Sequence, residues 1–380
     1  MTEEKSDQAF AYTPGLKIKE STSVDKERML PIRGEVLVDI GETVKEDTTI
    51  AQTTISGDPL IVDASTRLGI LPETLPECVM KKVGEEIQEG ETLCQYKMLF
   101  GLITRTIDCP VNGTLEAVSD VTGRIIIRTE PIPISLSAYI PGKVVNIKNS
   151  EGATIQTNAA FIQGIFGIGG EKHGEIKVLA ENPDDTLTPN MITEEHEDCI
   201  IIGGSLVTMP AIVRAIQMGV AGIVCGGINS TDLIKFLGKE IGVAITGEET
   251  LGLTLIITEG FGPLSMHSKT FQIFQRFNGY NACINGETQI RAGVIRPEVI
   301  IPHKPDETQK KKEQLSEGMV SGTPIRIIRN PYFGAIGKVV SLPVELVELE
   351  SHSKVRVLEA ELENGETVIV PRANVEIIEE

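Results

Sequence analysis

Tryptophan is absent from this chain of 380 residues, and aromatic residues make up only 4% of it. Its hydrophobic cores must therefore consist of Val, Ile and Leu, which recur throughout the sequence. No segment approaches the roughly 18 consecutive apolar residues of a membrane-spanning helix, and residues 1–10 have no apolar run behind them. We therefore expect a globular, cytoplasmic protein with no membrane partner.

Basic residues are also scarce, with 35 Lys and Arg against 54 Asp and Glu, which gives a net charge of −19. This charge repels phosphate backbones unless a local basic patch overrides it, so general nucleic-acid binding is disfavoured. The chain is too long for one ordinary hydrophobic core, and its length predicts about two to four domains.

Metal-binding and disulfide patterns are missing as well. The six cysteines form no CxxC pair, and the five histidines are scattered without the spacing that metal sites favour. The one local cluster of possible ligands is His196 near Cys199, among Glu194, Glu195 and Glu197. We interpret it as a solvated acidic loop before a strand, and we predict no metal and no cofactor.

Residues 31–185 repeat a short pattern, in which a strand-like segment precedes a glycine, two further residues and an aliphatic residue. Copies begin near Gly34, Val83, Pro110 and Pro141. Alternating apolar positions with glycine turns every ten or so residues are typical of an all-β barrel or sandwich. The copies resemble the biotinyl/lipoyl-like barrel-sandwich fold, whose halves carry this kind of segment.

In carrier proteins of that family, the modified lysine lies at a hairpin tip a few residues before the second copy of the motif. Lys97 is the nearest candidate here. A long and mostly apolar segment separates Lys97 from Pro110, unlike the carrier hairpin. We therefore favour a structural barrel over a covalently modified one.

A glycine-rich segment, residues 164–174, looks superficially like a phosphate-binding loop. A dinucleotide fingerprint requires such glycines to open a helix, but residues 175–179 have the pattern of a strand. A barrel rim or an interdomain hinge is the preferred interpretation.

The pattern changes over residues 186–302, where apolar strands alternate with capped helices. Strands are predicted at 199–202, 221–225, 243–246 and 254–258, and helices at 211–216, 229–237 and 265–277. Strands that are apolar on both faces and alternate with helices indicate a mostly parallel sheet with both faces covered. This segment is therefore predicted to be an α/β domain.

In such a domain the turns after the strands gather at the carboxyl edge of the sheet, where anions often bind. The predicted cluster consists of Gly203, Gly204, Ser205, Gly226, Gly227, Thr258, Glu259 and Gly260. A small anion or nucleotide is one interpretation. Structural turns are the favoured one, because no basic residue stands beside these turns in the sequence. Glu259 is the one carboxylate placed to act as an acid or base, but it has no evident partner.

The last part of the chain has the most specific motif. Residues 303–320 lack any hydrophobic period and are predicted to be a linker. In the segment 322–340, Ile325 and Ile327 line a strand, residues 331–334 form a loop, and Gly337 permits a close turn. This segment resembles the KOW motif of the NusG transcription factor and of certain large-subunit ribosomal proteins, which implies a small SH3-like barrel over residues 321–380.

In KOW domains the loop after the first strand commonly contacts RNA or a protein. The resemblance implies such contacts for Arg326, Arg329, Tyr332, Phe333 and Lys338. Residues 321–380 contain six basic and ten acidic residues, a net charge of −4, whereas RNA-binding barrels are usually basic. A protein partner is therefore at least as well supported as RNA or the ribosome.

We expect a multidomain protein of α/β and all-β parts. The predicted divisions are a flexible segment 1–30, a lipoyl-like β-rich domain 31–185, an α/β domain 186–302, a linker 303–320 and a KOW barrel 321–380. No complete catalytic constellation is present, so the leading hypothesis is a non-enzymatic adaptor or scaffold. The alternatives are a small-anion- or nucleotide-binding accessory subunit of an enzyme complex, and an RNA-binding factor of transcription or translation. The partner's identity and the oligomeric state are not predicted.

Overall fold

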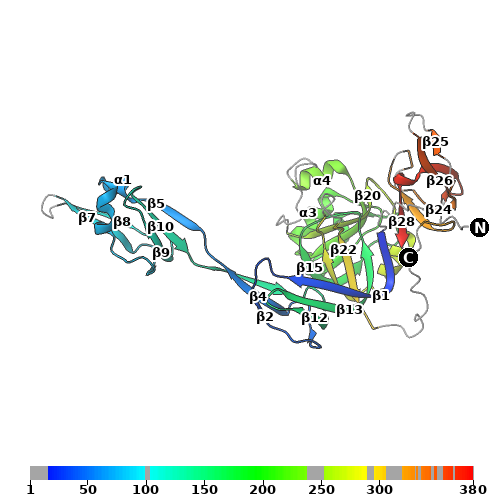
Figure 1. The fold of residues 1–380 in the computed structure, drawn as a ribbon. Helices are drawn as coiled ribbons and strands as arrows, with labels where there is room; N and C mark the ends of the chain where they lie inside the picture. Colours follow the sequence, from blue (N-terminus) through cyan, green and yellow to red (C-terminus); the bar gives the residue numbers. More distant parts are fainter. Residues whose placement is uncertain are drawn as a thin grey trace, which may run out of the picture.

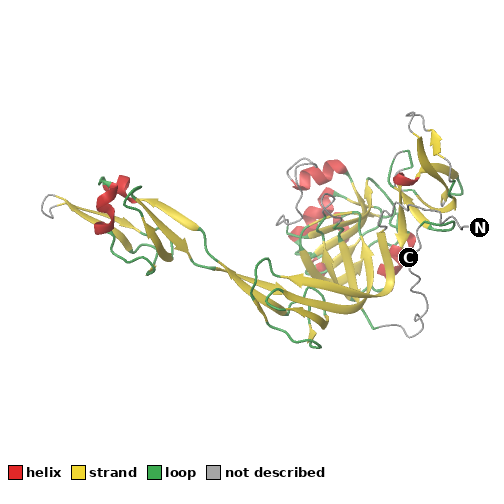
Figure 2. Cartoon of the chain, viewed as in Figure 1, coloured by secondary structure: helices red, strands yellow, loops and turns green. Residues whose placement is uncertain are grey.

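The computed structural model describes residues 16–98, 103–237, 252–288, 295–304, 319–329, 331–332, 335–343, 346–348, 354–362 and 364–379. Strands dominate this part of the chain, and the longer helices gather in its central region (Figure 2). The chain is thus mostly β with a large mixed sheet, which is compatible with the expected α/β and all-β parts. Of the helices described, none combines the length and the apolar character needed to cross a membrane.

Two separate stretches of chain build what we call the inner unit. Its strands are β1 (Leu16–Met29), β2 (Glu35–Val36), β3 (Thr43–Val44), β4 (Thr49–Ile55), β11 (Ile132–Ser137), β12 (Gly142–Lys148) and β13 (Gly152–Gln163). The long strands β1 and β13 pair antiparallel from Ile18↔Ile162 to Met29↔Gly152. Alternate residues such as Ile50, Val144 and Ile155 form its core.

The segment between β4 and β11 folds as a second β structure, the outer unit. It contains β5 (Pro59–Asp63), α1 (Ala64–Leu68), α2 (Leu75–Cys78), β6 (Glu86–Ile87), β7 (Thr92–Met98), β8 (Ile103–Asp108), β9 (Gly113–Val118) and β10 (Arg124–Thr129). Its hydrophobic core, which includes Leu75, Leu93 and Ile125, is separate from that of the inner unit. Only residues 56–58 and 130–131 join the two, and the outer unit projects from the rest of the molecule (Figure 1).

The sequence repeats are divided between these two units. The copies near Gly34 and Pro141 belong to the inner unit, and those near Val83 and Pro110 belong to the outer unit. Most of the stretch 31–185 therefore forms two nested hydrophobic cores, whereas Phe166, Ile168 and Ile176 near its end belong to the cores of the α/β unit. The alternation alone does not separate them, because both units obey the same period of two.

The third part is the α/β unit. Its elements are β14 (Phe166–Ile168), β15 (Glu171–Val178), β16 (Thr186–Leu187), β17 (Ile200–Ile202), β18 (Leu206–Val207), α3 (Met209–Gln217), β19 (Gly222–Ile228), α4 (Ser230–Leu237), β20 (Thr254–Phe261), α5 (Ser268–Arg276), β21 (Asn281–Asn285) and β22 (Glu298–Pro302). β15, β17, β19 and β20 are parallel neighbours, so the predicted parallel sheet is confirmed. The predicted strand at 243–246 lies outside the described residues.

Local signals account for the elements of this unit. The glycine-rich segment 164–174 runs into strand β15 rather than a helix, which confirms the strand predicted there. Helix α3 begins where the Thr208 side chain accepts a hydrogen bond from Ala211 N, with a proline in the first turn. β22 pairs with β13, so the α/β unit and the inner unit share one continuous sheet.

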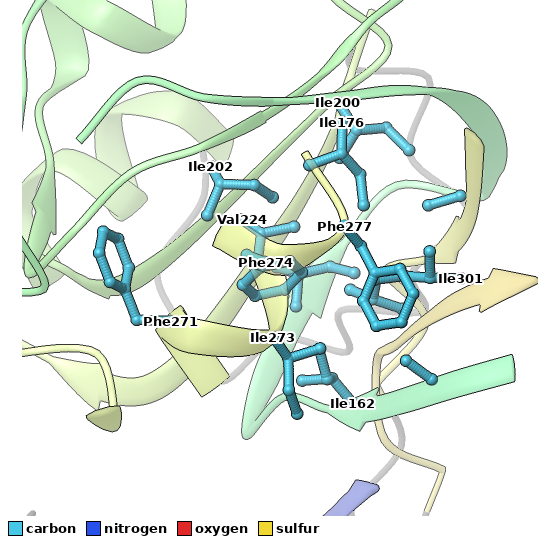
Figure 3. Close-up of a cluster of buried hydrophobic side chains, with 14 of the residues drawn as sticks. Ile162, Ile176, Ile200, Ile202, Val224, Phe271, Ile273, Phe274, Phe277 and Ile301 are labelled. Carbon is cyan, nitrogen blue, oxygen red and sulfur yellow. The ribbon is translucent and has the colours of Figure 1, made fainter. Parts of the chain in front are cut away.

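Helix α5 closes one face of the parallel sheet. Its buried aromatic side chains, Phe271 and Phe274, point toward the sheet, where they meet aliphatic residues such as Ile202 and Val224 (Figure 3). These residues are completely or nearly completely buried. This core, which has no tryptophan, consists mainly of isoleucines packed around a few phenylalanines.

The C-terminal unit is a small β structure. It contains β23 (Pro324–Ile327), β24 (Ile336–Ser341), β25 (Leu346–Glu348), β26 (Lys354–Leu362), β27 (Thr367–Pro371) and β28 (Val375–Glu379). β23 and β24 pair antiparallel, as expected for the strands on either side of the predicted loop. β28 pairs in parallel with β1 at Leu16↔Ile378, so the two ends of the described chain meet (Figure 1). Most of the predicted linker, residues 305–318, lies outside the described residues.

Candidate functional site

The carboxyl ends of β17, β19 and β20 meet at one edge of the parallel sheet, which we call the carboxyl edge. Gly226 N donates a hydrogen bond to Gly204 O at 2.7 Å. Gly227 faces Gly260 in the register of β19 and β20. The turns that were predicted to gather at the carboxyl edge therefore do lie close together.

The chain's own backbone fills the space around Gly226 and Gly227. A side-chain carbon on Gly226 would lie 2.2 Å from Leu264 O, and one on Gly227 would lie 1.9 Å from Gly262 O. The Ser205 hydroxyl donates to a backbone oxygen at 2.7 Å. Distances of this kind leave no space for any side chain, so glycine is required by close packing. This supports the structural interpretation of the double glycines over an anion site.

Arg326 of β23 reaches the same edge from the C-terminal unit. Its Nη1 donates to Thr258 O at 2.9 Å, to Glu259 O at 3.0 Å and to Glu259 Oε2 at 3.1 Å. Arg326 is only 2% exposed and Glu259 only 4%. The expectation that Arg326 contacts an outside partner is therefore wrong, because a buried guanidinium requires a carboxylate and finds it within the chain.

The same contacts correct the expectation for Glu259. One oxygen of its carboxylate binds Arg326, and the other accepts a hydrogen bond from His267 N at 3.1 Å. Both oxygens are thus engaged within the protein. A carboxylate held in this way is a structural anchor rather than a general acid or base.

A second buried ion pair lies beside the first. Arg296 of the α/β unit binds the Glu376 carboxylate of β28. Glu376 is also the cross-strand neighbour of Arg326 in the pairing of β23 with β28, which places both side chains on the same face. Arg296, Glu376, Arg326 and Glu259 form what we call the charge quartet, at the joint between the α/β unit and the C-terminal unit.

The other residues implied by the KOW resemblance are distributed differently. Arg329 and Lys338 are exposed to solvent. Tyr332 is half-buried and packs against the hydrophobic core of the C-terminal unit. Phe333 lies outside the described residues. Among the described members of the predicted set, Arg329 and Lys338 are therefore the ones whose side chains are exposed.

A groove of about 800 Å³, the acidic groove, lies at the opposite edge of the sheet. It runs between the amino ends of the parallel strands and the inner unit. Six carboxylates line it against two basic side chains, Lys172 and His173. The carboxylates are Glu46, Asp47, Glu171, Glu175, Glu197 and Asp198. Sequence reasoning missed this groove, because its six carboxylates come from three distant stretches of chain.

The side chains of the cluster noted around His196 have separate roles. The His196 ring accepts a hydrogen bond from Thr193 N at 3.0 Å and so closes a short helical turn. Glu197 and Cys199 line the acidic groove, whereas His196 does not. In the described parts of the chain, no three His, Cys, Asp or Glu side chains are grouped to hold a metal ion.

Several groove side chains are held by neighbours. Arg28 binds both oxygens of Glu171, at 2.5 and 2.7 Å. His173 Nε2 lies 3.5 Å from Asp47 Oδ2. Bidentate contacts of the first kind fix a carboxylate firmly, so this wall of the groove is preorganised.

The thiol and the phenol in the groove wall are not activated for nucleophilic chemistry. Burial raises the pKa of the Cys199 thiol, and burial likewise raises the pKa of the Tyr139 hydroxyl well above its usual value. Tyr139 OH donates to Glu298 Oε1 at 3.2 Å. A nucleophile needs a lowered pKa or an adjacent base, and these groups have the opposite shift. Neither of these two groups is therefore poised to act as a nucleophile.

No protein-family model matches this chain, and no curated protein matches its sequence. The contacts described above are therefore the basis on which a function is assigned.

Proposed function

We propose that this chain is a cytoplasmic, non-enzymatic scaffold that docks a protein partner by holding a basic, extended segment of it in the acidic groove. The observation that carries the proposal is the one-sided charge of the groove, six carboxylates against two basic side chains. Fields of one sign in a concave surface attract a partner of the opposite sign and orient it.

Half of these carboxylates are available to a partner. Among the described residues, Glu46, Glu197 and Asp198 have no ion-pair partner, whereas the other three are each paired. Lys and Arg side chains of a docked segment would supply the missing cations, and an arginine can bind a carboxylate through two parallel hydrogen bonds. The volume of about 800 Å³ lies within the range of ligand sites, about 300–1,000 Å³, and suits several side chains of an extended segment.

The shape of the molecule supports a scaffolding role. The outer unit has its own hydrophobic core and projects from the rest of the molecule on two short connections (Figure 1). It exposes large apolar side chains, including Leu71, Met80 and Val121. Exposed apolar residues on a projecting unit are suited to protein contact. The resemblance of residues 31–185 to barrel-sandwich domains and of residues 322–340 to the KOW motif supports the same interpretation.

Fluorescence anisotropy with a labelled Arg/Gly/Ser peptide tests the proposal, with a peptide carrying Glu in place of Arg as the reference. We expect the Arg peptide to bind and its affinity to fall as salt rises, because exposed charges are screened. The triple variant Glu46→Gln, Glu197→Gln, Asp198→Asn should bind about tenfold more weakly, since exposed ion pairs contribute about 0.2–1 kcal/mol each.

The matched control removes three exposed carboxylates from the outer unit, Glu73→Gln, Glu89→Gln and Asp120→Asn. It changes the net charge by the same amount and leaves the groove intact. Equal losses in the two triple variants would assign binding to overall charge, and the docking role of the groove would be withdrawn. No binding of the Arg peptide to the unchanged protein would have the same consequence.

A further inference from the structure

The C-terminal unit has a hydrophobic core of its own. Its members include Ile325, Leu358, Val368 and Val375, and they form a cluster distinct from those of the α/β unit. Among the described residues, this unit adds the buried side chain of Ile378 and the partly buried side chain of Ile336 to the core beneath helix α5. An element with its own core and a small apolar joint can separate from its neighbour without unfolding.

The centre of the joint is charged instead of apolar. The side chains of Arg326 and Glu259 are 3% and 5% exposed, and those of Arg296 and Glu376 are 16% and 4% exposed. Removing four charges from water is costly, and attraction within each pair offsets that cost only in part. The charge quartet therefore sets the geometry of docking closely while it adds little net free energy.

Docking of this unit covers the carboxyl edge of the α/β sheet. Arg326 Nη1 donates hydrogen bonds to the backbone oxygens of Thr258 and Glu259 and to the Glu259 carboxylate. Gly260 follows directly and lies opposite Gly227 of β19. If the C-terminal unit moves away, these acceptors face solvent while the strands that carry them keep their pairing within the α/β sheet.

We propose that the C-terminal unit is a reversible cover of the carboxyl edge: it undocks as a folded body, and the charge quartet is its latch. This inference is independent of the acidic groove, which lies at the other edge of the sheet. Undocking breaks the short β1–β28 pairing and the two buried ion pairs, and it leaves the parallel strands β17, β19 and β20 intact.

Hydrogen–deuterium exchange of the full chain, followed by mass spectrometry, tests the cover. In the unchanged protein, peptides that contain Leu16 of β1 and Ile378 of β28 should exchange together and faster than peptides from β17, because the amides of their pairing are released in the same undocking step. Uniform exchange across all three regions would overturn the proposal.

The second part of the experiment replaces Arg326, one residue of the charge quartet. Arg326→Met should speed exchange at the β1–β28 pairing by more than about tenfold, because it leaves the Glu259 carboxylate buried without a cation and so favours undocking. Exchange in β17 should stay unchanged. Equal acceleration in β17 would mean that the C-terminal unit is an integral part of one cooperative fold, and no acceleration anywhere would mean that the quartet is not a latch.

Two further variants keep this test decisive. Arg329→Met removes an exposed arginine two residues beyond β23 and should leave all exchange rates unchanged. Arg326→Met combined with Glu259→Gln removes both charges of the pair, and it should exchange more slowly at the β1–β28 pairing than Arg326→Met alone. If the double variant is as fast as the single one, the buried carboxylate is not the cause of undocking and the latch is refuted.

Discussion

Alkaline pH should destabilise this protein through Cys225, a fully buried residue of β19. Its thiol donates a hydrogen bond to Gly204 O at 3.2 Å. Burial raises the pKa of the Cys225 thiol from 9.0 to about 12, because the thiolate cannot be solvated inside the sheet. The perturbations are therefore a rise in pH and the substitution Cys225→Ala, which removes the titrating group.

The sign and size of the effect follow from the two pKa values. Below pH 9 the thiol is protonated in both the folded and the unfolded chain, so it makes no contribution to the pH dependence. Between pH 9 and about 12 the unfolded chain loses the proton and the folded chain keeps it, which favours unfolding. Each pH unit in this window costs about 1.4 kcal/mol, so the loss reaches about 3 kcal/mol two units above the unfolded pKa.

Urea unfolding followed by circular dichroism measures this loss for the unchanged protein and for Cys225→Ala. Other titrating groups, including Cys94 and Cys283 whose pKa values burial also raises to about 12, cancel in the difference between the two proteins. The free energy of unfolding of the unchanged protein, minus that of Cys225→Ala, should fall by about 3 kcal/mol over the two pH units above 9. Val224 is a buried neighbour without a titrating group. The substitution Val224→Ala should therefore lower the free energy of unfolding by the same amount at every pH. A constant difference between Cys225 and alanine would refute the reasoning.

Three further predictions concern packing and partners. Gly227→Ala should unfold or strongly destabilise the α/β unit in thermal melts, because its new carbon meets Gly262 O, whereas Gly170→Ala has open space and should be neutral. Phe274→Ala should lower the free energy of unfolding by about 3–5 kcal/mol in urea titrations. With Arg326 buried, we expect no salt-dependent retention on immobilised RNA. If retention does occur, it should disappear when Arg329 and Lys338 are both replaced by alanine.

Much of the local structure was predictable from the sequence, because local signals control it. The apolar run at 199–202 became β17, and the Thr208 cap with its proline started α3 at Met209. The grouping of the double glycines at one sheet edge was also predictable, since parallel strands end on the same side. The hydrophobic period shows which face of an element is buried, and a capping residue marks where a helix begins. Both can be recognised without knowing which distant residues pack nearby.

The candidate sites were harder to predict because their members are far apart in the chain. Glu259 lacks a partner in its own neighbourhood, and its cation, Arg326, lies 67 residues later in another unit. The acidic groove combines residues near position 46 with residues near positions 171 and 197. The spacing of charges along a sequence does not reveal which of them meet after folding.

The sequence by itself determined the strands, the capped helices, the close glycine turns and the acidic character of the molecule. The tertiary structure decided that residues 59–129 form a nested unit, that Arg326 faces inward, and that six carboxylates share one groove. The physical reason is that local patterns depend on the next few residues, whereas the environment of a charge depends on which distant segments pack around it. A buried ion pair requires two elements at one place, and only the assembled fold provides that place.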